Sequence, residues 1–162
     1  MSASADLSIE EFTGLLAPRR PLFGLDLGTK TIGVAVSDVS RMIASGLTTI
    51  ARVKFKLDVA ELLALAERHQ VCGLVIGLPL NLDGTSGPRV QSTRSFVRNL
   101  APLSPLPILL WDERLSTVAA ERMLIDADAS RRRRAEVIDK VAATIILQGA
   151  LDRMRHRANV GH

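Results

Sequence analysis

The feature that most limits the fold is an uninterrupted apolar run, VCGLVIGL, at Val71–Leu78. A strand exposed on one face carries a polar side chain at every second position, so this run predicts a strand that is covered on both faces. Helical patterns lie on either side of it, at Leu57–His69 and Arg89–Leu100. The covering layers are therefore expected to be helices packed on a sheet.

The segment before this run predicts an antiparallel hairpin. Leu22–Leu27 and Thr31–Ser37 are short apolar or β-branched runs separated by a turn that contains Gly28. Leu47–Val53 is a candidate for a third strand, and Ile108–Trp111 for a later one. The prediction is an α/β mixed sheet, in which an antiparallel meander is followed by parallel strands and flanked by helices. Further helices are expected near Ser8–Leu16, at Thr117–Ile125 and at Ala135–Asp152, with a polar link at Asp126–Arg134.

The length of 162 residues fits one domain. We expect an N-terminal extension at residues 1–20, the folded domain at 21–155 and a C-terminal tail at 156–162. A single cysteine, Cys72, excludes a disulfide scaffold and a multi-cysteine zinc site. The longest apolar runs fall short of the roughly 18 residues of a membrane-spanning helix. Since the acidic N-terminus also lacks a signal-peptide pattern, we expect a cytoplasmic protein with no membrane partner.

Basic charge is concentrated towards the C-terminus. Residues 131–162 carry a net charge of +5, whereas the rest of the chain carries −1. This imbalance indicates a polyanionic partner such as nucleic acid, and a solubilising tail is the alternative explanation. Arg131–Arg134 would reach nucleic acid as a flexible arm, with binding that weakens as the salt concentration rises.

Three elements carry acidic residues at positions that need an explanation. Asp26 lies within an apolar strand, on the same face as Gly24, where an unpaired carboxylate is unfavourable. Its neighbour across the hairpin is expected to be one of the small residues Gly33, Ala35 or Ser37. Asp112 and Glu113 directly follow a strand, and Asp139 lies among alanines near the start of the last helix. Carboxylates that converge from separate elements can hold Mg²⁺, and two such ions about 4 Å apart can promote phosphodiester hydrolysis. A cap or a surface ion pair is the alternative for each acid, and for Asp112 the two interpretations are equally supported.

Four sequence blocks carry a family resemblance. In order they are GLDLGTKTIGVAVSD (Gly24–Asp38), VIGLPLNLDGTSGPR (Val75–Arg89), WDERLSTVAAERML (Trp111–Leu124) and DKVAATIILQGALD (Asp139–Asp152). Their order and spacing resemble the YqgF family, also called RuvX, over about residues 20–153. Members of this family are described as Holliday-junction resolvases and are linked to the processing of pre-16S rRNA.

The resemblance implies an RNase H-like fold and a metal-dependent nuclease. It identifies Asp26, Glu113 and Asp139 as the catalytic carboxylates, which would bind Mg²⁺ or Mn²⁺, with two ions expected. It also implies a structured nucleic acid as partner, with the 5′ end of pre-16S rRNA favoured over branched four-way DNA. The N-terminal extension and the basic link at Arg131–Arg134 depart from the family pattern. We further expect a monomer or a weak homodimer.

Beside these acids, several polar and basic residues are candidates for contacts with nucleic acid. Loops and turns that follow strands are places where side chains can meet a sugar-phosphate chain. A solvated surface role is the alternative for each of these side chains. The candidates are Lys30, Asn81, Arg89, Arg94, Arg98 and Arg114.

Three alternatives stay open from the sequence. DLGT followed by a hairpin also begins the phosphate-binding element of sugar kinases and actin-like ATPases, although those folds need two such domains. A protein that keeps the fold without catalysis would be an RNA-binding or ribosome-assembly factor. A resolvase needs two active sites in a suitable dimer, and no strong dimerisation pattern is present, which favours RNA over four-way DNA.

Overall fold

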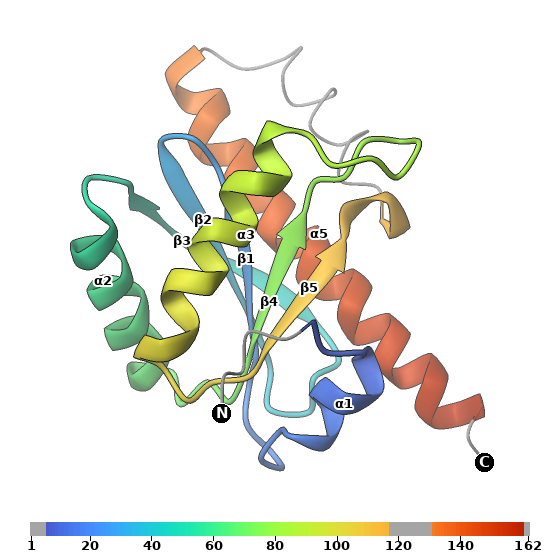
Figure 1. The fold of residues 1–162 in the computed structure, drawn as a ribbon. Coiled ribbons are helices and arrows are strands. Elements are labelled where there is room, and N and C mark those ends of the chain that lie inside the picture. The colour runs from blue at the N-terminus through green and yellow to red at the C-terminus, as the bar shows by residue number, and fades with distance from the viewer. Residues whose placement is uncertain (1–5, 117–130, 161–162) are drawn as a thin grey trace.

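A five-stranded sheet forms the centre of the protein (Figure 1). The computed structural model describes residues 6–116 and 131–160, with the side chains of residues 6–116 and 140–157. The strand order β3-β2-β1-β4-β5 places β1 in the middle of the sheet. The strands are β1 (Phe23–Leu27), β2 (Thr31–Ser37), β3 (Ala44–Ala51), β4 (Leu74–Leu78) and β5 (Ile108–Asp112).

The strand directions confirm the predicted mixed sheet. β1 and β3 both pair antiparallel with β2, whereas β4 pairs parallel with β1 and with β5. Within the hairpin, Asp26 lies opposite Gly33. Because β1, β4 and β5 run in the same direction, their C-terminal ends meet at one edge of the sheet. We call this edge the C-terminal edge.

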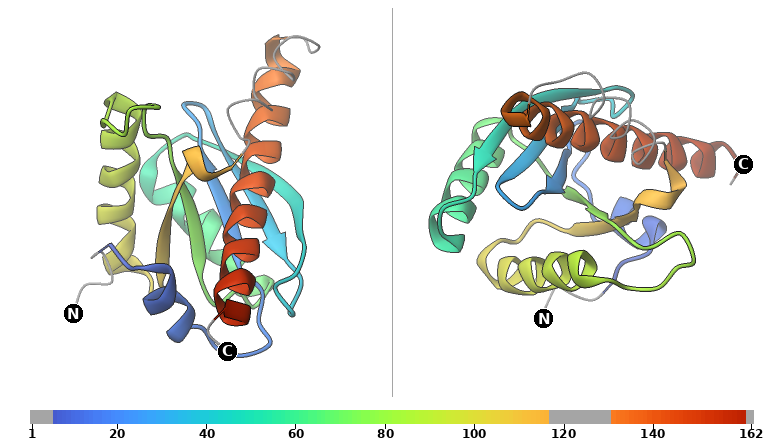
Figure 2. Two further views of the ribbon diagram at one scale, coloured as in Figure 1. Left: turned by 90° about the vertical axis from the view of Figure 1, so that its right-hand side faces the viewer. Right: turned by 90° about the horizontal axis from the view of Figure 1, so that it is seen from above.

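Helices cover both faces of the sheet, as Figure 2 shows from the side and from above. α2 and α3 pack on one face and α5 and α1 on the other, each against its own apolar cluster. This confirms the double covering that the apolar run predicts. The helices are α1 (Ile9–Gly14), α2 (Phe55–Arg68), α3 (Pro88–Leu100) and α5 (Arg131–Val160), with short 3₁₀ helices η1 (Ala101–Leu103) and η2 (Glu113–Leu115).

Glycines in the strands let α5 pack close to the sheet. A Cβ atom at Gly24 would lie 2.8 Å from the carbonyl oxygen of Ala143, so only glycine fits there. At Gly46 of β3, a Cβ would lie 3.0 Å from the side chain of Lys140. The helix therefore crosses the middle of the sheet almost in contact with the strand backbones.

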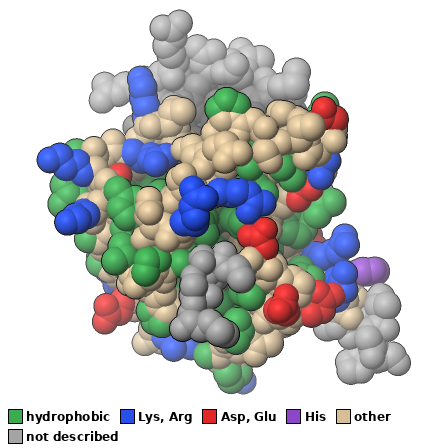
Figure 3. Space-filling model, in the orientation of Figure 1, with side chains coloured by type: hydrophobic (Ala, Val, Ile, Leu, Met, Phe, Trp, Pro, Cys, Tyr) green, Lys and Arg blue, Asp and Glu red, His purple; other side chains and the backbone are tan. Residues whose placement is uncertain are grey.

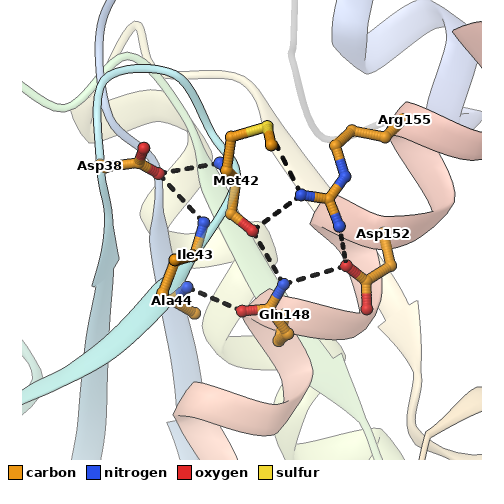
Figure 4. Close-up of polar contacts among 7 residues, drawn as sticks. All are labelled: Asp38, Met42, Ile43, Ala44, Gln148, Asp152 and Arg155. Carbon is orange, nitrogen blue, oxygen red and sulfur yellow. Dashed lines mark hydrogen bonds and ion pairs between the residues drawn. The ribbon is translucent and has the colours of Figure 1, made fainter.

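Polar contacts also fix the second half of α5 to the loop between β2 and β3 (Figure 4). Gln148 accepts a hydrogen bond from the backbone N–H of Ala44 at 2.8 Å and donates to the carbonyl of Met42 at 3.0 Å. Arg155 donates to the same carbonyl at 2.9 Å and pairs with Asp152. These contacts set the position of the helix along its axis as well as its distance from the sheet.

Two predicted boundaries in the strands are wrong. β3 was expected at Leu47–Val53 and lies at Ala44–Ala51, because its pairing with β2 continues through a register shift down to Ala44. Beyond β3 the backbone N–H of Val53 donates to the carboxylate of Asp58 at 3.0 Å. This hydrogen bond ties Val53 to the first turn of α2 instead of to β2, so the strand ends before it. β4 is shorter than Val71–Leu78, because the N–H of Val71 bonds to the end of α2 instead of to a strand.

The prediction of a polar link at Asp126–Arg134 is wrong for the residues that belong to the last helix. Arg131–Arg134 form the first turn of α5, which is 30 residues long and extends past both ends of the predicted Ala135–Asp152. Arginine is a good helix former, and a search for apolar periodicity cannot detect a helical turn made of arginines alone. The predicted helix at Thr117–Ile125 and residues 126–130 of the link lie outside the described residues.

The short N-terminal helix near Ser8–Leu16 is confirmed as α1. Ser8 and Glu11 form a capping box at its start, and Phe12 is completely buried against the α5 face of the sheet. Residues 8–16 therefore belong to the packed structure. Among the described helices, none has the length and apolar character needed to cross a bilayer.

Candidate active site

Asp26 is a buried carboxylate at the C-terminal end of the central strand. Its exposed fraction is only 1%. It lies two residues after Gly24, and residues two apart in a strand share a face, so Asp26 faces α5. Gly33 lies opposite it on β2, in agreement with the predicted small neighbour. Gly33 itself places no side chain next to the carboxylate.

Glu113 reaches the same face from another element. It is the first residue of η2, directly after β5. A Cβ atom placed on Gly77 of β4 would lie 2.7 Å from Oε2 of Glu113, so this carboxylate lies over the backbone of β4. Leu25 pairs with Ile76, and the next residues along these two strands are Asp26 and Gly77. The fold therefore brings Asp26 and Glu113 to the same face at the C-terminal edge.

Asp139 lies in α5, and its side chain is outside the described set. Among the described side chains, no three His, Cys, Asp or Glu residues form a group that could hold a metal ion. Asp26 and Glu113 are the members of the predicted triad whose side chains are described. Both supply carboxylate oxygens, the ligand type that Mg²⁺ prefers.

A cleft of about 390 Å³ opens beside Glu113 at the C-terminal edge. The loop between β4 and α3 forms one wall and η2 forms the other. Three of the predicted nucleic-acid contacts, Asn81, Arg89 and Arg114, line this cleft together with Glu113. A strand of nucleic acid lying in it would pass directly beside that carboxylate.

Arg114 is held by protein groups inside this cleft. Its guanidinium binds both carboxylate oxygens of Asp112 and lies 3.4 Å from the carbonyl oxygen of Leu82. The side-chain hydrogen bond from Arg114 holds the pKa of Asp112 below its ordinary value, and Asp112 in turn raises the pKa of Arg114. A Cβ at Gly84, whose φ is +88°, would lie 3.1 Å from the same guanidinium. Arg114 thus links the cleft loop to the turn that carries Glu113.

Asn81 also shapes the cleft loop. Its side-chain amide donates to Oγ1 of Thr85 at 2.9 Å. Asp83 accepts hydrogen bonds from the hydroxyl and the backbone N–H of Thr85, which lower the pKa of Asp83. The loop is therefore ordered by its own side chains before any ligand enters the cleft.

The remaining predicted contacts lie outside the cleft. Arg94 pairs with Asp6 at 3.2 Å, and Arg98 donates to Ser95 at 3.0 Å, both on α3. Lys30 is exposed in the turn between β1 and β2, four residues after Asp26. Figure 3 shows Lys and Arg side chains gathered over α3 and the start of α2. The basic residues therefore extend beyond the cleft onto the face that α2 and α3 cover.

Sequence reasoning missed Gly77 as part of the site. A Cβ there would meet both Ile146 and Glu113, so the position needs glycine for packing and for the carboxylate. A glycine inside an apolar strand is a sign of close approach by another group. That sign was present in VCGLVIGL, but the sequence could not show which group approaches.

Comparisons with known proteins agree with this geometry. A model of the RuvX family, described as Holliday junction resolvase, matches residues 20–153. A Rhodobacter capsulatus protein named "Putative pre-16S rRNA nuclease" is 60% identical over 148 residues, which cover 91% of this chain and 93% of that protein. A Cereibacter sphaeroides protein of the same name is 63% identical over 147 residues, 91% of this chain and 92% of that protein.

A solved structure shares the fold at low sequence identity. Thermus thermophilus RuvC in complex with a Holliday junction substrate superposes with a TM-score of 0.50 and 13% identity. The match covers 83% of this chain and 96% of that one, and it confirms the predicted RNase H-like architecture. The family match spans nearly the whole described fold and both described carboxylates. This chain belongs to the RuvX family.

Proposed function

We propose that the protein is a metal-dependent nuclease that hydrolyses phosphodiester bonds of structured nucleic acid, and that pre-16S rRNA is its substrate. The observation that carries the proposal is the meeting of Asp26 and Glu113 on one face of the C-terminal edge, beside a cleft that Asn81 and Arg89 line. The names of relatives about 60% identical to this chain support the substrate.

The course of α5 supports Asp139 as the third carboxylate. α5 runs antiparallel to β1, with its first turns at the C-terminal edge (Figure 1). Position 139 precedes Ala143, the residue next to Gly24, by about 6 Å of helix rise. Asp26 lies about 6.6 Å beyond Gly24 in the same direction along β1. The backbone of position 139 is therefore expected over Asp26.

The donor set fits Mg²⁺ or Mn²⁺. Asp26, Glu113 and Asp139 would hold the ions, since all three offer hard carboxylate oxygens. Gly77 leaves open the space next to Glu113 that a larger residue would fill. A pair of bound ions would lower the pKa of a water molecule and stabilise charge on the attacking and leaving oxygens.

The other residues of the cleft orient the substrate. Arg89 and Asn81 line the path that a phosphate backbone would follow. The pair of Asp112 and Arg114 fixes η2, so that Glu113 stays over β4 without rearrangement when substrate binds. Such preorganisation lowers the cost of reaching the transition state.

Four-way DNA is the second candidate substrate. The description of the family as Holliday junction resolvase favours it, and a resolvase requires a dimer with two symmetric sites. Pre-16S rRNA is preferred because the closely similar proteins carry that name. Since bacteria make that precursor in the cytoplasm, we infer that the protein acts there.

The test is a cleavage assay with Mg²⁺ or Mn²⁺ on a labelled pre-16S leader RNA and on a four-way DNA junction. Asp26→Asn is the inactive variant, and Glu67→Gln, which changes an exposed carboxylate near the end of α2, is the matched control. The expected result is RNA cleavage by the wild type and by Glu67→Gln alone. Paired symmetric nicks in the junction would favour the resolvase. Equal cleavage by a folded Asp26→Asn protein, or none by any variant, would contradict the proposal in favour of a binding or assembly factor.

A further inference from the structure

A second group of basic side chains lies on the other side of Asp26 from the cleft. It comprises Lys30, Arg52, Lys54 and Lys56, and we call it the hairpin flank. Lys30, Lys54 and Lys56 are exposed, and Arg52 is half-buried. The flank comes from two segments, the turn after β1 and the connection from β3 to α2.

Hydrogen bonds hold the hairpin flank next to the active site. Arg52 donates through Nη1 to the carbonyl of Gly28 at 2.7 Å, and its backbone N–H donates to the carbonyl of Lys30 at 2.9 Å. The guanidinium also stacks over the ring of Phe96 on α3, 5.6 Å from its centroid. Because Gly28 is two residues after Asp26, these bonds fix the connection from β3 to α2 beside the C-terminal edge.

Among the described side chains, no acid forms an ion pair with Lys30, Arg52, Lys54 or Lys56. The segment ARVKFKL at residues 51–57 contains three cations and no anion. The next acid, Asp58, is 4% exposed and accepts a hydrogen bond from Val53 within the same connection. Adjacent exposed cations repel one another, so such a group favours the approach of a polyanion.

We infer that the phosphate backbone of the substrate crosses the C-terminal edge from the cleft to the hairpin flank, so that the protein holds it on both sides of the cleaved bond. This inference rests on the proposed nuclease function, because it places the cleaved bond at Asp26 and Glu113. Arg89 contacts the substrate on the cleft side, and Lys54 and Lys56 contact it on the other. Binding on both sides fixes the bond between two anchored segments, which a single cleft could not do.

The experiment measures the affinity of the full-length protein for a labelled pre-16S leader RNA in EDTA, where no hydrolysis occurs, over a series of salt concentrations. The test variant is Lys54→Gln/Lys56→Gln. The matched control is Arg19→Gln/Arg68→Gln, which removes two exposed positive charges elsewhere on the surface. We expect the test variant to bind about tenfold more weakly, and the slope of log K against log salt to fall by about 0.7–0.9 for each lost contact. The control should change neither quantity by as much.

Two further measurements separate the possible causes. Lys54→Arg/Lys56→Arg keeps the charge and should bind as the wild type does. RNAs shortened on one side of the cleavage site should lose their sensitivity to Lys54→Gln/Lys56→Gln, and RNAs shortened on the other side should keep it. Equal effects of test and control variants, an unchanged salt slope, or sensitivity that survives both truncations would overturn the inference. A protein that binds as predicted but cleaves nothing would instead contradict the proposed function.

Discussion

Arg114 binds both carboxylate oxygens of Asp112, through Nε at 3.0 Å and through Nη2 at 2.7 Å. Asp112 and Arg114 are the sequence neighbours of Glu113 on either side. Arg114 also donates to the carbonyl of Leu82 in the loop between β4 and α3. The sequence-based candidate for a phosphate contact is therefore bound to a protein carboxylate. We therefore expect Arg114 to act on the site by holding Glu113 in position.

Breaking this pair should lower turnover more than binding. Asp112→Asn and Arg114→Gln each remove an ion pair that is joined by two hydrogen bonds. Because Glu113 would then be misplaced, we expect kcat to fall by about tenfold to a hundredfold. Both side chains reach solvent, which screens the pair, so their coupling in the free energy of unfolding should be small. A double-mutant cycle that measures kcat, KM and urea unfolding tests this. Additive effects on kcat would show that the two residues act separately.

Adding one methyl group at Gly77 should damage both stability and activity. In Gly77→Ala the new Cβ would meet Ile146 and lie 2.7 Å from Oε2 of Glu113, so we expect a loss of about 1–3 kcal/mol in unfolding free energy. Combining it with Ile146→Val removes the contacting Cδ1, which should restore much of the stability but not the activity. Gly14→Ala is the control, because no atom lies within 4 Å of that Cβ. Joint recovery of stability and activity would show that the carboxylate tolerates the methyl group.

Metal binding should stabilise the protein even without substrate. An ion present at 100 times its Kd raises the unfolding free energy by about 2.7 kcal/mol. We expect Mn²⁺ to raise the Tm of the wild type and of the control variant Glu67→Gln, and EDTA to reverse the rise. Asp26→Asn and Glu113→Gln should show a much smaller shift. An equal shift in all four proteins would place the metal elsewhere.

Asp38 should make stability depend on pH in the acidic range. Backbone N–H groups of Ile43 and Met42 donate to its carboxylate and lower its pKa below the ordinary 3.8. Because the folded-state pKa is depressed, this contribution is fully present above pH 3.8 and is lost as the pH falls through the folded value. Urea unfolding of wild type and Asp38→Asn at several pH values should show a difference that shrinks on acidification. A difference independent of pH would exclude the carboxylate charge as its cause.

The sequence predicted the parts of the fold that depend on local patterns. β2 lies at the expected Thr31–Ser37, and Asp26 has the small neighbour that strand periodicity required. The predicted start of β3 was wrong because a register shift is set by the partner strand, which a single segment cannot reveal. The first turn of α5 was missed because Arg131–Arg134 carry no apolar face.

The candidate site was predictable in its residues but only partly in their roles. Asp26 and Glu113 could be singled out because a carboxylate within or directly after an apolar strand is unfavourable unless it has a partner. The link between Arg114 and Asp112 was not predictable, since it depends on how a short 3₁₀ turn orients two side chains. The same holds for the contact of Arg52 with Gly28, which joins segments 24 residues apart.

The anchoring of α5 by Gln148 and Arg155 has a mechanical consequence for catalysis. One continuous helix joins these anchors to position 139, which is roughly 24 Å of helix rise from Arg155. The contact at Gly24 lies between the two ends and can serve as a pivot, so that a tilt of about 10° would move position 139 by about 1 Å. Displacements of that size can lower turnover about a hundredfold. Through the proposed role of Asp139, the loop between β2 and β3 would control catalytic alignment from the opposite end of α5.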